Sequence, residues 1–134
     1  MTHKLKHDRR PGAVIVEMAF TLPVFALIVL ASVEASSMIF LKQSLEIAAY
    51  EGARIAIVPG SDSGNVQAGC QQMLSARRVV VESIAVTPID FDRHPYGTPI
   101  RVEITANCID NCLISPWFYV NKSISADVTM MKEY

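Results

Sequence analysis

The hydrophobic pattern changes abruptly along the chain, from one long apolar run to shorter periodic segments. From Met18 to Val33 no residue is charged. A helix rises about 1.5 Å per residue, so about 20 residues cross the hydrocarbon core of a bilayer. The segment 14–33 has this length, provided that Glu17 lies near one membrane interface. The pattern therefore predicts a transmembrane helix over residues 13–35.

Apolar residues continue at helical spacing beyond this run and stop at Pro59, where a proline and a glycine signal the end of a helix. The helix is therefore expected to extend over residues 36–58, outside the membrane. Small residues recur at every fourth position in this part: Ala48, Gly52 and Ala56. Small side chains let a second backbone approach closely. These small residues are expected to pack either against the protein's own sheet or against a helix of another subunit.

Residues 59–134 show the patterns of a small α+β domain. Three- and four-residue spacing predicts a helix over 65–83, with Ser63 or Asn65 as its N-cap. Strand candidates follow at 84–90, 100–107 and 123–130. Pro88 interrupts the first and makes it an edge strand, whereas strict alternation in the other two predicts one buried and one solvated face. We therefore expect an outer domain with one helix and a short antiparallel sheet of about three strands.

The charges that precede the apolar run predict its orientation. Only Asp8 opposes four basic residues there: Lys4, Lys6, Arg9 and Arg10. The positive-inside bias makes residues 1–12 a cytoplasmic leader and places the chain after about Ser36 outside the membrane. A secretory signal peptide is the alternative, because residues 31–37 are mostly small, although the run is longer than a typical signal core.

Composition limits the chemistry that the chain can perform. The 134 residues suffice for one modest domain, and the formal net charge of −1 gives no support for a nucleic acid as partner. His94 is the only histidine outside the leader, so a zinc site would lack ligands. No glycine-rich phosphate loop with its lysine occurs. We therefore predict no enzyme activity, no metal and no cofactor.

Three cysteines follow the apolar run, on the side expected to be oxidising: Cys70, Cys108 and Cys112. The simplest arrangement is one disulfide and one free thiol. Cys108 and Cys112 flank a turn-like insert, so a local disulfide between them is the prediction. Cys70 lies on the apolar face of its predicted helix and remains an alternative partner for either, or a buried thiol.

Three consecutive aromatic residues, Trp117, Phe118 and Tyr119, stand near the end of the chain. On a strand, at least one of three successive side chains faces outward. They therefore form either a contact surface or a cover for the edge of the sheet.

The start of the apolar run resembles a class III signal, the prepilin type. Its sequence is RRPGAVIVEMAF at residues 9–20, with a basic leader, Gly12 and then Glu17 five residues later. The resemblance implies that a membrane peptidase cuts after Gly12 on the cytoplasmic side and frees the α-amine of Ala13. An amine and a carboxylate at the membrane edge are each costly alone and offset each other's desolvation when paired. Glu17 is then expected to set the register between neighbouring helices; the alternative is a tolerated interfacial acid.

Residues 9–60 more specifically resemble TadE-like proteins, pilin-like components of tight adherence (Tad/Flp) pili. The shared features are the basic-then-glycine start with its glutamate, Pro23 within the apolar helix, and the block AAYEGAR at residues 48–54. The resemblance implies a pilin-like fold and a minor pilin or pseudopilin that serves surface attachment.

The same resemblance implies the location and the partners of the protein. The protein is expected to cross the bacterial inner membrane once, and incorporation into the extracellular pilus is a second expected location. The implied partners are related pilin-like subunits, in a heterodimer or a fibre, the prepilin peptidase and the pilus assembly platform. Two other functions fit parts of the pattern: a periplasmic binding or sensor module held by an uncleaved anchor, and a secreted thiol enzyme.

Overall fold

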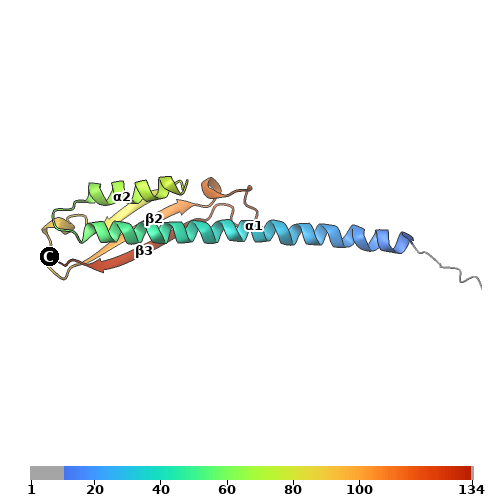
Figure 1. Cartoon of the computed structure of the whole chain (residues 1–134), viewed down its shortest axis with the longest axis horizontal. Coiled ribbons are helices and arrows are strands. Elements are labelled where there is room, and N and C mark those ends of the chain that lie inside the picture. The colour runs from blue at the N-terminus through green and yellow to red at the C-terminus, as the bar shows by residue number, and fades with distance from the viewer. Residues whose placement is uncertain (1–10, 134) are drawn as a thin grey trace, which may run out of the picture. The chain divides into compact units, whose positions relative to one another are not determined.

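The structure, a computed structural model, describes residues 11–133, which form an α+β fold as predicted (Figure 1). The elements in chain order are α1 (Pro11–Ala56), α2 (Ser63–Ala76), β1 (Ser83–Thr87), the 3-10 helix η1 (Phe91–Arg93), β2 (Pro99–Asn107), the 3-10 helix η2 (Ile109–Asn111) and β3 (Ser123–Met131). The chain divides into two compact units, one that ends at Val33 and one that begins at Glu34. Each unit is described by itself.

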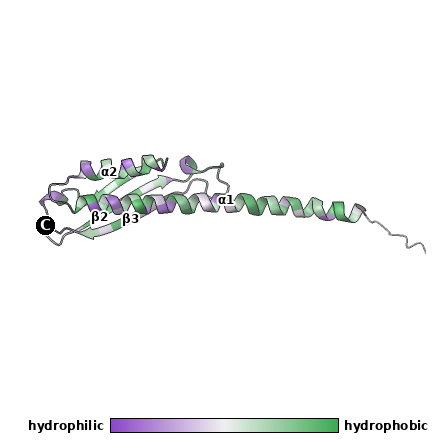
Figure 2. Ribbon diagram, in the orientation of Figure 1, coloured by the Kyte–Doolittle hydropathy of each residue, from purple (hydrophilic) through white to green (hydrophobic). Residues whose placement is uncertain are grey.

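The first unit contains the N-terminal part of α1, in which apolar residues predominate (Figure 2). Every described side chain from Gly12 to Leu30 is exposed. By length and composition, residues 12–56 form the one helix in the described part of the chain that is suited to cross a membrane. The predicted long apolar helix is thus confirmed, and it continues through Pro23 as one element.

The second unit contains an antiparallel sheet in the order β1-β2-β3. On β2, Val102 and Ile104 are fully buried, whereas Arg101 is exposed and forms an ion pair with Asp127 of β3 (3.2 Å). Because successive side chains of a strand point to opposite faces, the sheet has one buried and one solvated face, as predicted. β1 lies at one edge, as predicted, but it ends at Thr87, before Pro88, and does not reach residue 90.

The loop between the two helices corrects one predicted cap. α1 ends at Ala56, and α2 begins at Ser63 after the exposed Asp62. The Asp62 carboxylate accepts a hydrogen bond from the backbone N–H of Asn65 (2.7 Å). A side-chain oxygen that accepts from an amide of the first turn is the mark of an N-cap. The cap is therefore Asp62, and the prediction of Ser63 or Asn65 was wrong.

The end of α2 was also predicted wrongly, since the helix stops at Ala76 and does not reach residue 83. Arg78 adopts the left-handed region with φ of 57°, and the amide of Val79 donates back to the carbonyl of Leu74 (3.0 Å). Such a reversal satisfies the last carbonyls of a helix and ends it. Val79 is buried beyond this turn, so the apolar residues that continued the helical spacing belong to the approach to β1.

The second half of α1 and α2 together cover the buried face of the sheet (Figure 1). α1 contributes large residues such as Leu41 and Leu45 and the whole stripe of small residues, all buried. A Cβ added at Gly52 would collide with Cys70 Sγ on α2 and lie 3.2 Å from Val102 Cγ1 on β2. Of the two expected uses of the stripe, the structure shows the first: it packs inside the subunit.

Candidate assembly and membrane-contact site

The expected cleavage site and Glu17 lie in the first turns of α1. Gly12 and Ala13 are helical, and a Cβ added at Gly12 would meet no atom within 4 Å. Glu17 is exposed, and among residues 11–133 its carboxylate has no ion-pair partner. A carboxylate surrounded by apolar side chains in a membrane needs water or an external partner. The basic residues of the leader lie outside the described residues.

A second acid, Glu34, organises the connection between η2 and β3. Its Oε1 accepts hydrogen bonds from three consecutive backbone amides, those of Trp117 (3.1 Å), Phe118 (2.8 Å) and Tyr119 (3.0 Å). Amides that converge on one carboxylate oxygen form a charge-assisted anion nest. The connection is therefore attached to α1 at the first residue of the second unit.

Sequence reasoning missed this contact because Glu34 and its partners are separated by 83 to 85 residues. Two local signals existed. Glu34 is the first charged residue after the apolar run, and residues 113–120, LISPWFYV, are themselves free of charge.

Residues 113–120, here called the aromatic loop, are exposed over most of their length. The exposed apolar side chains are those of Leu113, Ile114, Trp117, Phe118 and Val120. The rings of Trp117 and Phe118 lie 6.2 Å apart. The structure thus places the aromatic residues in a loop and not on a strand, with Trp117 and Phe118 largely exposed. Their exposure favours a contact surface over a cover for the sheet edge, and the contact itself stays a prediction.

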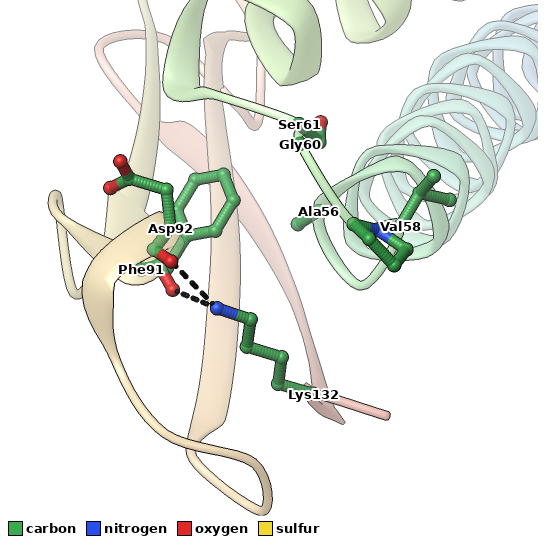
Figure 3. A pocket seen from close by; sticks show the side chains of 8 residues that line it. Ala56, Val58, Gly60, Ser61, Phe91, Asp92 and Lys132 are labelled. Atoms are coloured by element: carbon green, nitrogen blue, oxygen red, sulfur yellow. Dashed lines mark hydrogen bonds between the residues drawn. The ribbon is translucent and has the colours of Figure 1, made fainter. Parts of the chain in front are cut away.

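A cavity of about 180 Å³ lies at the C-terminal end of α1, lined by Ser61, Phe91 and Lys132 among others (Figure 3). Lys132 Nζ donates to the backbone oxygens of Phe91 (3.0 Å), Asp92 (2.9 Å) and His94 (2.9 Å). An ammonium group has three hydrogens, and these contacts use all of them. Lys132 therefore holds the η1 loop and offers no hydrogen for an anionic ligand, so this cavity does not favour a binding module.

The three cysteines are free thiols in the structure, and Cys70 and Cys108 are buried. Cys70 Sγ donates to the carbonyl of Ala48 (3.4 Å), and burial raises the pKa of its thiol from 9.0 to about 11. Burial also raises the pKa of Cys108 and of Cys112, and for Cys112 the charge of a Cys108 thiolate adds to the rise. The disulfide between Cys108 and Cys112 stays a prediction. Within residues 11–133 no group of three or more His, Cys, Asp or Glu is placed to hold a metal ion.

Comparison with known families finds a match for one segment of the chain. The family model described as "TadE-like protein" matches residues 12–54. Over these residues the chain is similar to the TadE-like family. The resemblance is thereby confirmed over the apolar run, Glu17 and the small-residue block. No curated protein and no solved structure matches the chain.

The TadE-like segment coincides with α1 and ends two residues before this helix does. It includes Glu34, whereas the aromatic loop and the sheet lie beyond it. The match thus covers the helix alone, and the rest of the chain must be interpreted from its own structure.

Proposed function

We propose that this TadE-like protein is a minor pilin or pseudopilin that takes part in the assembly of a tight adherence pilus for surface attachment. The observation that carries the proposal is the family match over residues 12–54, which covers an exposed apolar helix with one acid near its start. The role is structural, and the proposal includes no catalytic step, cofactor or metal.

The proposed topology follows from the helix and from the charges that precede it. Residues 13–35 cross the bacterial inner membrane, with the leader 1–12 in the cytoplasm. Residues 36–58 continue the helix outside, and residues 59–134 form the outer domain. The prepilin peptidase, the assembly platform and related pilin-like subunits are the proposed partners.

In this proposal, cleavage after Gly12 supplies an ion-pair partner for Glu17, which has none among residues 11–133. Ala13 and Glu17 are four residues apart, so about 6 Å of helix rise separates them and they lie on the same helix face. The new α-amine of Ala13 can therefore pair with Glu17 of its own subunit or of a neighbour. Because the first turn of α1 is helical, it must unwind before a peptidase binds it in extended form. Pairing of the two charges in a low-dielectric layer then favours one register between adjacent helices.

The test combines the mature N-terminus with the distribution of the subunit. Mass spectrometry of the membrane-extracted protein is expected to show an N-terminus at Ala13. Glu17→Gln keeps the size of the side chain and removes its charge. Breaking a buried ion pair costs about 3–5 kcal/mol, so the amount of subunit in sheared pili or assembly complexes is expected to fall at least about tenfold. The amount in membranes is expected to stay the same.

Glu46→Gln is the matched control. Glu46 is an exposed acid on α1 that pairs with Lys42 at 3.4 Å, and exposed pairs contribute little. This variant is expected to behave like the parent protein. A mature protein that keeps its leader, or normal assembly of the Glu17→Gln variant, contradicts the proposal and favours an uncleaved anchor.

A further inference from the structure

The aromatic loop presents more apolar surface than a connection between two elements normally does. Leu113 is 84% exposed, Trp117 70% and Phe118 65%. Contiguous exposed apolar side chains mark a surface that contacts lipid or another protein. No residue from 113 to 120 is charged, so no charged side chain within the loop opposes its transfer to an apolar environment.

The loop is held beside one particular residue of α1. The three amides that bind the Glu34 carboxylate belong to the loop's own aromatic residues, at 2.8 to 3.1 Å. Glu34 directly follows Val33, the last residue of the charge-free run. If residues 14–33 fill about 30 Å of hydrocarbon, Glu34 lies in the layer of lipid headgroups. The loop that it binds is therefore at the same level.

The chemistry of the loop suits this layer. Tryptophan and tyrosine are enriched where a membrane meets water, because their rings are apolar and carry one polar group. Lys122 borders the loop, with its Nζ 5.3 Å from the centre of the Tyr119 ring. A cation beside aromatic rings matches the phosphate groups that lie outside the acyl chains.

We infer that the aromatic loop is a second membrane contact, in which Trp117 and Phe118 enter the interfacial layer of the outer surface of the bilayer. Glu34 is the positioning residue, since it fixes the loop at the depth where α1 leaves the membrane. The inference rests on the membrane span of the proposed function. The partner is the lipid interface, and a second copy of the chain is the alternative that the test must separate.

Trp117 is the only tryptophan of the chain, so the fluorescence of the full protein reports on the loop alone. The protein is reconstituted into vesicles of phosphatidylcholine and phosphatidylglycerol that contain lipids brominated either near the headgroup or at the acyl-chain end. Trp117 emission is expected to shift to the blue and to be quenched more strongly by the bromines near the headgroup. In Glu34→Ala this quenching is expected to fall by at least half, whereas Glu34→Gln, which keeps an accepting oxygen, retains part of it.

Two tryptophans placed elsewhere, each combined with Trp117→Phe, serve as matched controls. Phe25→Trp reports on the span and is expected to be quenched most by bromines at the chain end. Tyr96→Trp reports on an exposed loop that shares a surface pocket with Lys132. Lys132 also lines the cavity at Ala56. Ala56 follows Glu34 by about 22 residues, or ~33 Å of helix, so the control tryptophan lies far from the Glu34 end of the domain. Tyr96→Trp is expected to remain unquenched.

Each contrary outcome has a separate meaning. If Phe25→Trp is quenched and Trp117 is not, the loop does not touch lipid, and the inference fails while the span of the proposed function holds. If neither is quenched, the span itself fails and both proposals fall. If Trp117 emission is blue-shifted without lipid quenching, and the shift disappears on dilution in detergent, the loop contacts another copy and the inference is overturned.

Discussion

Replacing Gly52 with alanine tests how closely α1 packs against α2 and the sheet. The added Cβ would collide with Cys70 Sγ and lie 3.2 Å from Val102 Cγ1 and 3.4 Å from Val66 Cγ1. All three neighbours are buried, so they have little room to move. Overpacking of this kind costs about 1–3 kcal/mol, while alanine gains about 0.5–1 kcal/mol over glycine inside a helix. We expect a net loss of about 1–2 kcal/mol in the free energy of unfolding.

Thermal unfolding of the full chain in detergent, followed by near-UV circular dichroism, measures this loss. For a domain of about 60–100 residues, 1 kcal/mol corresponds to ~4–8 °C in Tm, so Tm is expected to fall by at least about 4 °C. Gly69→Ala on α2 is the matched control. Its Cβ would collide only with Ile55, whose half-buried side chain is flexible, so this variant is expected to keep or raise Tm.

The double variant Gly52→Ala with Cys70→Ala places a methyl group where the sulfur was. The double variant is expected to recover part of the lost free energy of unfolding, with an interaction free energy between the two substitutions of roughly 0.5–3 kcal/mol. A Gly52→Ala protein with the same rise in Tm as Gly69→Ala would refute the close contact between the helices.

Four further predictions concern the outer domain. Because burial raises the pKa of Cys70 to about 11, iodoacetamide should label it about 100-fold more slowly than an ordinary thiol at pH 8 and at the normal rate after unfolding. The raised pKa of Cys70 also means that the folded state favours the neutral thiol. The free energy of unfolding, relative to that of Cys70→Ala, is therefore expected to be constant below about pH 9 and to decline as the pH rises towards 11. Denaturant midpoints measured across this pH range check the decline. Lys132→Met leaves three backbone carbonyls, among them that of Phe91, without their hydrogen-bond donor. The free energy of unfolding in urea should fall by roughly 1–3 kcal/mol. An unchanged urea midpoint would show that these hydrogen bonds do not stabilise the fold. Asp62→Ala should cost about 0.5–2 kcal/mol and lower amide-exchange protection in the first turn of α2, with Asp62→Asn close to the parent.

The elements with strong periodicity could be predicted from the sequence alone. Alternation on β2 identified Ile100 to Ala106 as one buried face, since a strand repeats every two residues whatever its partners are. The long helix was likewise evident from its apolar run. The end of α2 was not, because Val81 and Ile84 continue the helical spacing while the reversal depends on the backbone of Arg78. A pattern of side chains carries no information about one left-handed residue.

The residues of the candidate site also differ in whether the sequence alone could reveal them. Glu17 is conspicuous locally, as a single acid in an apolar run, and the family match covers it. The nest around Glu34 depends on amides 83 to 85 residues away, and a backbone donor is present at every residue except proline, so no residue type reveals it. The use of the small-residue stripe also required the structure, because only the contacts of Gly52 show which backbone approaches it.

The continuity of α1 has a practical consequence for any fragment of this protein. The same helix supplies the apolar run and the side chains of Leu41 and Leu45 in the core. A fragment that starts at the first turn, near Pro59, would lose those side chains and leave the inner face of the sheet uncovered. The boundary of a water-soluble fragment therefore lies inside a helix, before Met38, and a domain limit drawn at the loop would yield an aggregating product.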